Sequence, residues 1–189
     1  MDMPIIHGAG VFLMMLCKYS QKNSKVILTG EGADELFGGY LYFNHASNSI
    51  QFDNECRRLL DNIYMFDVLR SDRSISSNGL EARTPFLDKT FVKYYLSIPP
   101  ELKVFNSKDR IEKHILRKAF DNGTYLPDDV LWRRKVAFSD GVSSQKKSWH
   151  KIIQNHVNSK ISDVEFFKAR DSFSHCTPVL KESYSYTFL

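Results

Sequence analysis

A short apolar run that passes directly into a glycine-rich turn is the feature that most constrains this chain. Val26-Ile27-Leu28 reads as a short buried strand, because it is too apolar to alternate. The turn that follows, TGEGADE (29–35), carries two glycines, which let backbone N–H groups approach a ligand closely. Ligands of open α/β sheets bind beyond the carboxyl ends of the strands, so this corner is the predicted functional site.

The acids in the same turn argue against a bare phosphate as the ligand. Glu31, Asp34 and Glu35 place three carboxylates within five residues, and they would repel an anion. A magnesium–nucleotide removes the conflict, because one carboxylate can hold the hard cation while the glycines leave room for the nucleotide. A lone acid in a turn is more often a cap residue, but three acids among glycines after an apolar strand favour a binding site.

Spacing alone leaves other chemistries open. Paired carboxylates also serve glycosidases, whose two acids face each other across a sugar-sized gap that a sequence does not reveal. The turn lacks the pattern GxxxxGK[ST], which disfavours a P-loop nucleotide hydrolase, and it lacks the DxDxDG pattern of a calcium loop.

The composition is that of an ordinary globular domain. The chain has 189 residues, of which 42% are hydrophobic and 25% are charged. Its net charge of +4 is mild, and its basic residues are interleaved with acids, as in RIEKHILRKAFD (110–121). This pattern predicts a solvated surface and no nucleic-acid partner.

The first apolar run, at 11–17, has the length of a signal-peptide core. Asp2 stands where a basic segment would be needed, and Lys18 ends the run far short of a membrane span, so we expect a buried helix with Met14 and Met15 in the core and no membrane partner. The three cysteines are far apart and odd in number, which fits a reducing, cytoplasmic setting better than a disulfide framework.

The rest of the chain reads as helical. One continuous apolar face is expected through Leu59, Ile63, Phe66 and Arg70, and turn residues predict an ordered loop over 77–90. Further helices are expected at about 9–22, 89–97, 109–121 with His114 in the core, around 149–157, at 163–170 with Ser162 as N-cap, and from Pro178 onward. One strand cannot make a sheet by itself, so the pattern predicts a piece of a larger α/β enzyme domain that is mostly α and looks cut at both ends.

The turn and a series of later segments resemble one known family. TGEGADELFGGYLYF (29–43) resembles the signature of the synthetase domain of glutamine-hydrolysing asparagine synthetases, where Ser more often stands at the position of Thr29. The resemblance runs over about residues 9–189 in the family's order, which makes it far more specific than any single motif. The other matching segments are YMFDVLRSDR (64–73), NGLEARTPFLD (78–88), IEKHILRKAF (111–120), LWRRKVAFSDGV (131–142) and FSHCTPVLKESYSY (173–186).

The resemblance implies the fold and the reaction. It implies a partial Rossmann-like adenine-nucleotide-hydrolase domain of the N-type ATP-pyrophosphatase fold, truncated on its N-terminal side. Within the synthetase domain at 1–189, about 9–45 would be the remnant of the nucleotide-binding core and about 50–189 the helical part. In this family ATP adenylates the β-carboxylate of aspartate, pyrophosphate leaves, and ammonia from glutamine attacks the acyl-adenylate. ATP and Mg²⁺ are therefore the expected cofactors.

The resemblance also assigns roles within the turn. It places Thr29 and Gly30 at the ATP, Glu31 at the formation of the β-aspartyl-adenylate, and Asp34 at the magnesium of the pyrophosphate. Lys135 matches the family lysine that meets the charge of the leaving group, whereas composition alone would make it a surface lysine at a helix end.

Further residues match positions around the family's site. Asp67 and Arg70 match positions near the aspartate pocket, although their i, i+3 spacing is explained equally well by a structural ion pair. Glu81, Arg83 and Asp88 match the EARxPFLD loop, where we expect a buried scaffold network that supports the site.

Two departures from the family limit what this chain is expected to do alone. Asp2 follows Met1 where the family's glutaminase domain begins with cysteine, and the upstream SGGxDS phosphate loop is absent from this sequence. Ammonia would therefore come from a glutaminase domain outside the chain, and catalysis would need an upstream synthetase half. Two alternatives stay open: a β-lactam-forming synthetase of the same superfamily, and a non-catalytic fragment or partner-dependent subunit.

Overall fold

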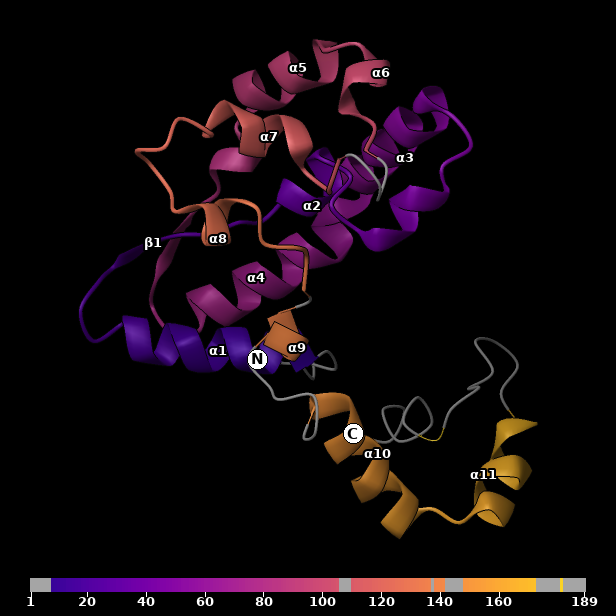
Figure 1. Ribbon diagram of the computed structural model, residues 1–189. Coiled ribbons are helices and arrows are strands. Elements are labelled where there is room, and N and C mark those ends of the chain that lie inside the picture. Colours follow the sequence, from indigo (N-terminus) through magenta and orange to yellow (C-terminus); the bar gives the residue numbers. More distant parts are fainter. Residues whose placement is uncertain (1–7, 106–109, 137, 142–147, 173–180, 182–189) are drawn as a thin grey trace. The chain divides into compact units, whose positions relative to one another are not determined.

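The computed structural model describes residues 8–105, 110–136, 138–141, 148–172 and 181 (Figure 1). The chain divides into two compact units, one of residues 1–12 with 136–189 and the other of residues 13–135. No helix in the described part of the chain is long and apolar enough to cross a membrane. The predicted division into a core at about 9–45 and a helical part at about 50–189 is a different partition and stays a prediction.

The unit at 13–135 is mostly helical and holds a small parallel sheet, which agrees with the expected α/β class. Its elements are α1 (Gly8–Ser20, which begins in the other unit), β1 (Val26–Leu28), α2 (Ala33–Leu36), η1 (Leu41–His45), α3 (Ser49–Asn62), η2 (Ile63–Met65), α4 (Asp67–Ser76), β2 (Glu81–Arg83), η3 (Pro85–Leu87), α5 (Lys89–Ser97), α6 (Pro100–Lys103), α7 (His114–Ala119) and α8 (Asp128–Leu131).

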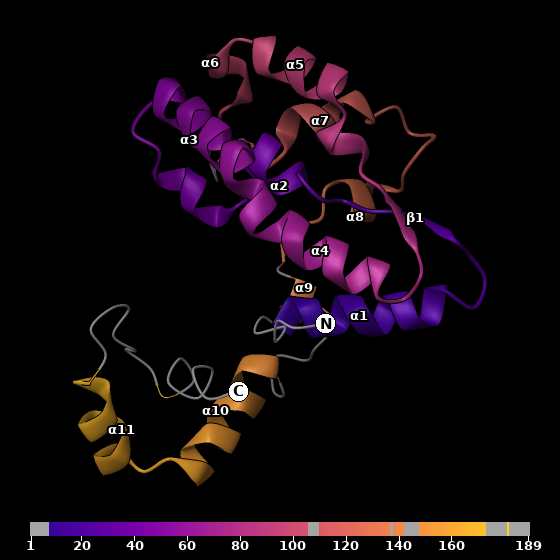
Figure 2. The same cartoon turned by 180° about the vertical axis from the view of Figure 1, so that it is seen from behind.

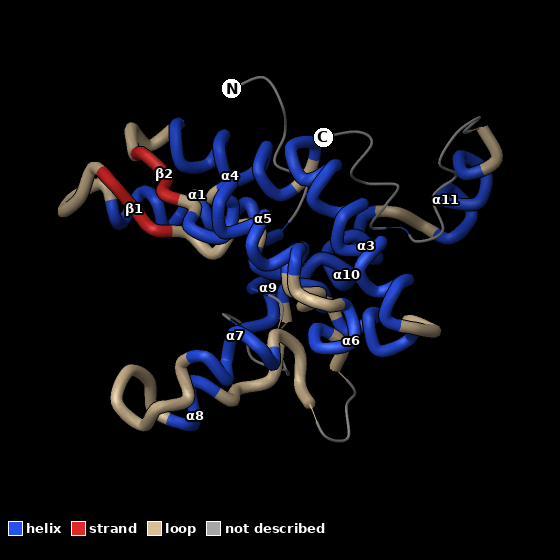
Figure 3. Tube along the Cα trace, turned by 90° about the horizontal axis from the view of Figure 1, so that it is seen from above, coloured by secondary structure: helices blue, strands red, loops and turns tan. Residues whose placement is uncertain are grey.

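The sheet shows that one sequence expectation was wrong. The segment 81–83, expected within a loop, forms β2 and pairs in parallel with β1, with Ile27 opposite Ala82 (Figure 3). Ile27 and Ala82 pack against a buried cluster of Cys17, Ile75 and Leu80 from α1, α4 and the segment before β2.

The other face of β1 is exposed, although the sequence predicts that it is buried. Val26 is 43% exposed and Leu28 is 80% exposed, because within the described residues the helices α1 and α4 cover only the face that carries Ile27. A run that is apolar at every position predicts a strand covered on both faces, but the described residues cover one face.

Helix boundaries also differ where the chain breaks a regular pattern. The expected face through Leu59 and Arg70 is interrupted at Phe66, whose dihedral angles (φ −118°, ψ −97°) are not helical, so α3 and α4 are separate helices. The helix expected at 109–121 is the shorter α7, since Lys113 adopts a left-handed conformation (φ 60°) just before it. The strong periodic segments at 89–97 and 163–170 form α5 and α11 (Asp163–Arg170) as predicted.

Some apolar side chains were wrongly expected to be inside. Met15 is 65% exposed and Met14 is only half-buried. The buried residue that anchors α1 is Cys17. Periodicity places apolar residues on one face of a helix, but too few described residues pack against this helix to bury the whole face.

Two aromatic clusters hold the helices of this unit together. Phe37 is buried against Tyr95, Phe86 and Phe91, with ring centroids 4.5 Å, 5.7 Å and 6.1 Å away. A second cluster of Phe43, Phe52, Cys56 and Phe105 fixes α3, which lies beside α2 and α6 (Figure 2). The two clusters hold in place the segment that follows β1.

The unit of 1–12 with 136–189 contains α9 (Phe138–Gly141), α10 (Trp149–Lys160) and α11 in its described residues. The Ser162 hydroxyl accepts a hydrogen bond from the backbone N–H of Glu165 (3.1 Å), which confirms the predicted N-cap. Lys181 pairs with Asp163 (2.6 Å) beside that cap. The helix expected from Pro178 onward lies outside the described residues.

Candidate functional site

The turn after β1 is fixed at both ends by backbone hydrogen bonds. The N–H of Thr29 donates to the carbonyl of Arg83 (2.9 Å), and the N–H of Ala33 donates to the carbonyl of Gly30 (3.1 Å). Gly32 has φ 85°, and a Cβ there would lie 2.3 Å from a methyl group of Leu87, so only glycine fits. The turn therefore delivers Asp34 and Glu35 into the short helix α2 in a fixed orientation.

The first two residues of the turn offer a hydroxyl group to which no described residue hydrogen-bonds and an open space that none fills. The Thr29 hydroxyl is buried and has no hydrogen-bond partner among the described residues. Gly30 is exposed, and a Cβ there would meet nothing within 4 Å. Nothing within the described fold requires glycine at this position, which suits a backbone that must leave room for a ligand.

Asp34 lies between two lysine side chains. Its Oδ1 is 2.8 Å from Nζ of Lys113, and its Oδ2 forms an ion pair with Nζ of Lys135. Burial alone would raise the pKa of the Asp34 carboxyl, but the two ammonium groups outweigh this effect and hold the pKa below its ordinary value. The corner thus carries an ionised carboxylate beside two cations.

Both lysines are positioned by structure that the sequence did not reveal. The buried Glu112 carboxylate accepts from the backbone N–H of Lys135 (2.6 Å) and from Arg117 (3.0 Å). Lys113 reaches Asp34 from its left-handed backbone conformation. Gly39 leaves room for this pair, because a Cβ there would lie 2.2 Å from Oδ1 of Asp34.

A second acidic group follows Asp34 directly in α2. Glu35 is buried and accepts a hydrogen bond from the Tyr40 hydroxyl. Burial raises the pKa of the Glu35 carboxyl, and the charges of Asp67 and Asp34 add to the rise. Burial also raises the pKa of Glu31, although the nearby Ser71 hydroxyl offsets part of the rise.

Asp67 and Arg70 form the predicted i, i+3 ion pair at the start of α4. Both residues also line a cavity of about 360 Å³ together with Glu35, Tyr40 and Phe66. The structural reading and the functional reading of these two residues are therefore compatible: the ion pair lies in the wall of a cavity that reaches α2.

The predicted buried scaffold network was wrong. Glu81 and Arg83 pair with each other on the exposed face of β2, with side chains 60% and 57% exposed. Asp88 caps α5 by accepting from the N–H of Phe91 (2.9 Å). The three residues share a sequence motif but no network, because alternation along β2 turns both charged side chains outward.

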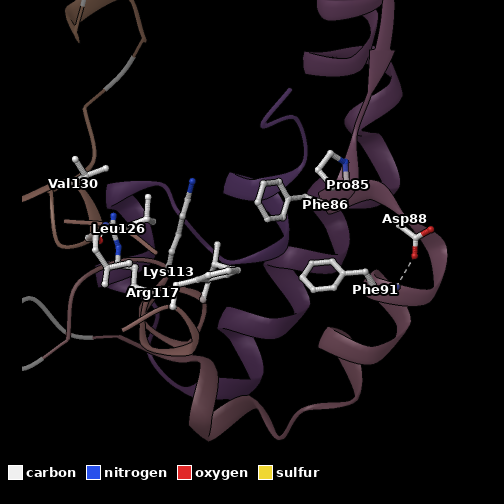
Figure 4. Close-up of a pocket in the computed structure, with 11 residues that line it drawn as sticks. Pro85, Phe86, Asp88, Phe91, Lys113, Arg117, Leu126 and Val130 are labelled. Carbon is white, nitrogen blue, oxygen red and sulfur yellow. Dashed lines mark hydrogen bonds between the residues drawn. The ribbon is translucent and has the colours of Figure 1, made fainter. Parts of the chain in front are cut away.

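A larger cavity of about 680 Å³ lies beside Lys113 (Figure 4). Phe86 and Phe91 line one side, facing Leu126 and Val130 across it. Its charged lining groups are engaged elsewhere: Lys113 with Asp34, Arg117 with Glu112, and Asp88 with the α5 cap. The described residues that line the cavity offer no free charged group to orient a reacting substrate, so the polar corner around Asp34 is the better candidate site.

Comparison with known proteins identifies the family. The family model described as asparagine synthase matches residues 1–57 and 48–182 of this chain. The chain belongs to the asparagine synthase family. Proteins named asparagine synthetase [glutamine-hydrolyzing] from Rattus norvegicus, Homo sapiens and Gallus gallus are 47%, 46% and 44% identical to it over 180 residues. Each alignment covers 94% of this chain but 32% of the relative.

Membership in the asparagine synthase family agrees with the resemblance inferred from the motifs, and the geometry adds residues to it. Sequence reasoning named Asp34 and Lys135, and the structure brings them together although they are 101 positions apart. It missed Lys113, Glu112 and Tyr40, and it counted Glu35 among the acids of the turn without giving it a role. The left-handed conformation of Lys113 leaves no mark in the sequence, but the second glycine pair, at 38–39, was a visible signal of a close approach.

The donor set bears on the expected magnesium ion. No group of three or more His, Cys, Asp or Glu residues that could hold a metal occurs among the described residues. Asp34 offers one ionised carboxylate, which fits a Mg²⁺ ion that takes its other ligands from phosphate oxygens and water. It does not fit an ion held by protein ligands alone.

Proposed function

We propose that this chain is the C-terminal part of an asparagine synthetase that amidates aspartate at the expense of ATP. The observation that carries the proposal is the ionised Asp34 between Lys113 and Lys135, in the same turn as the open space at Gly30 and a buried Thr29 hydroxyl that has no partner among the described residues. The Rossmann-like N-type ATP-pyrophosphatase fold, the substrates and the cytoplasmic location belong to the same proposal.

The chemistry suits this charge arrangement. An oxygen of the aspartate β-carboxylate attacks the α-phosphorus of ATP, the bond to the bridging oxygen breaks, and pyrophosphate leaves with the electron pair. Lys113 and Lys135 are placed to neutralise the charge that develops on this leaving group. Ammonia then displaces AMP from the acyl group and loses a proton to give the amide.

Each site residue has a role in this proposal. Thr29 and Gly30 meet the nucleotide, Asp34 supplies a carboxylate to Mg²⁺, and Glu31 serves the adenylation step. Asp67 and Arg70 border the aspartate pocket, since they line the cavity that reaches α2. Mg²⁺ when bound would add positive charge at the phosphates.

The activity belongs to the whole protein, because this chain spans about a third of the length of its relatives. We propose that an upstream segment supplies the facing phosphate loop and that a glutaminase domain supplies ammonia from glutamine. The test is aspartate-dependent pyrophosphate release by the chain joined to, or co-expressed with, an upstream half that carries the SGGxDS loop. Release no greater than from either half alone would contradict the proposal, and release without aspartate would favour a β-lactam-forming synthetase.

Lys135→Met tests the leaving-group role directly. Removing the ammonium should lower kcat by about 100-fold or more while the fold is retained, since one preorganised charge contact of this kind is lost. Lys118→Met is the matched control, because Lys118 is 66% exposed and pairs with Asp121 on the surface. Equal activity of the two variants would remove Lys135 from the mechanism.

A further inference from the structure

Tyr40 contacts two groups close to Asp34, the Glu35 carboxylate and the Lys135 ammonium. Its hydroxyl donates a hydrogen bond to Oε1 of Glu35. Its ring lies 5.8 Å from Nζ of Lys135, measured to the ring centroid, within range of a cation–π interaction. Lys135 is itself paired with Asp34, so the Tyr40 side chain contacts both the acid that follows Asp34 in α2 and a cation that pairs with Asp34.

The surroundings of Tyr40 hold its ring in one orientation. The ring is stacked on Tyr42, with centroids 6.0 Å apart and planes 8° from parallel. The preceding backbone is constrained, because a Cβ at Gly38 would lie 2.3 Å from the Phe52 ring and one at Gly39 would strike Asp34. An aromatic residue held this firmly can fix the positions of the groups it contacts.

The surroundings of Tyr40 keep its hydroxyl protonated, so that it can donate a hydrogen bond. Burial, followed by the hydrogen bond to Glu35, raises the pKa of Tyr40 above its ordinary value. Glu35 is buried near the charges of Asp67 and Asp34, so without its donor the carboxylate would be poorly solvated and free to turn.

We infer that Tyr40 is a positioning residue of the synthetase site: its hydroxyl holds Glu35, and its ring face holds the Lys135 ammonium against Asp34. This inference rests on the proposed function for its catalytic consequence, but the contacts themselves do not depend on that function. Tyr40 also lines the cavity of Asp67 and Arg70, so the same side chain borders that cavity and contacts the lysine that pairs with Asp34.

The first test uses the whole protein and the pyrophosphate-release assay. Tyr40→Phe keeps the ring and removes the donor, and it should lower kcat by about tenfold or more, because small misplacements of reacting groups are costly. If Tyr40 acts through Glu35, the Tyr40→Phe/Glu35→Gln double variant loses about as much as Glu35→Gln alone. Tyr94→Phe removes an exposed hydroxyl on α5 and is the matched control.

Two results of this assay would overturn the inference. One is a Tyr40→Phe variant with the kcat of the Tyr94→Phe control. The other is full additivity of the Tyr40→Phe and Glu35→Gln losses, which would mean that the two residues act independently. A melting temperature of Tyr40→Phe within the range of the control excludes a loss of folded protein as the cause.

The second test needs no activity and uses this chain. The protein is labelled with 3-fluorotyrosine, and the ¹⁹F resonance that Tyr40→Phe removes is assigned to Tyr40 among the nine tyrosines. Glu35→Gln and Lys135→Met should each shift this resonance, and Lys118→Met should not. Shifts in this chain together with no pyrophosphate release by the wild-type chain joined to its upstream half would reject the proposed function and retain the Tyr40 contacts. An active wild type without shifts would reject the inference about Tyr40.

Discussion

At the scale of single residues, the two glycines of the TGEGADE turn differ in whether the fold requires them. Gly32 has a left-handed backbone that a side chain strains, and its Cβ position is occupied by Leu87. Gly30 has neither constraint in the described fold. The sequence shows two equivalent glycines, and the structure assigns one to the fold and gives the other no structural role among the described residues.

Gly30→Ala and Gly32→Ala should therefore separate binding from stability. Gly32→Ala should lower the free energy of unfolding by about 1–3 kcal/mol through backbone strain alone. Gly30→Ala should leave that free energy within about 0.5 kcal/mol of wild type and weaken ATP binding by the whole protein. Denaturant unfolding and calorimetric titration with ATP measure the two effects. Unchanged ATP affinity in Gly30→Ala would contradict the ligand contact assigned to Gly30.

At the scale of elements, ion pairs join helices that are distant in sequence. Lys103 at the end of α6 is buried, its side chain 1% exposed, and it pairs with Asp53 of α3. Arg57 also donates to Asp53 (2.7 Å). Burial alone would raise the pKa of the Asp53 carboxyl, but the two cations hold it below its ordinary value.

This pair predicts a pH dependence of stability. Because the Asp53 pKa is lowered on folding, its contribution is present above the ordinary value of 3.8 and is lost as pH falls through the folded value. Asp53→Asn should lower the free energy of unfolding by about 3–5 kcal/mol near neutral pH, since it leaves Lys103 buried without its partner. Urea unfolding at several pH values should show that the difference in free energy of unfolding between wild type and Asp53→Asn becomes smaller below about pH 4. A constant difference would contradict the assignment.

Glu112 likewise connects segments that are distant in sequence, here at the candidate site. It ties α7, through Arg117, to the backbone of Lys135. Glu112→Gln should lower the free energy of unfolding by about 2 kcal/mol, because charge-assisted hydrogen bonds weaken, and it should also reduce pyrophosphate release by misplacing Lys135. Asp121→Asn, which affects an exposed pair at the C-terminal end of α7, is the control. A loss of stability without a loss of activity would separate Glu112 from the positioning of Lys135.

At the scale of the whole molecule, the uncovered face of the sheet is the feature with consequences for behaviour in solution. Val26 and Leu28 expose apolar side chains next to each other on one strand face. Apolar strand surface of this kind promotes self-association. We expect this chain to associate with increasing concentration and Leu28→Ser to reduce that association without a change in melting temperature. Analytical ultracentrifugation measures it, and identical association of the two proteins would contradict the prediction.

The sequence by itself determined the family, the strong helices and the corner proposed as the site. The order of motifs that resembles the asparagine synthase family, the strand at 26–28 and the Ser162 cap all depend on local spacing, which a sequence displays directly. Asp34 and Lys135 were also named from their motifs. Local patterns succeed here because turn chemistry and helical periodicity act over a few residues.

Only the tertiary structure decided which of these residues act together. The pairing of β2 with β1, the outward turn of Glu81 and Arg83, and the two lysines at Asp34 all depend on contacts between segments far apart in the chain. The roles of Glu112 and Tyr40 depend on such contacts as well. Hydrogen bonds and ion pairs are fixed by distances of a few ångströms, and packing sets those distances, so residue spacing along the chain does not encode them.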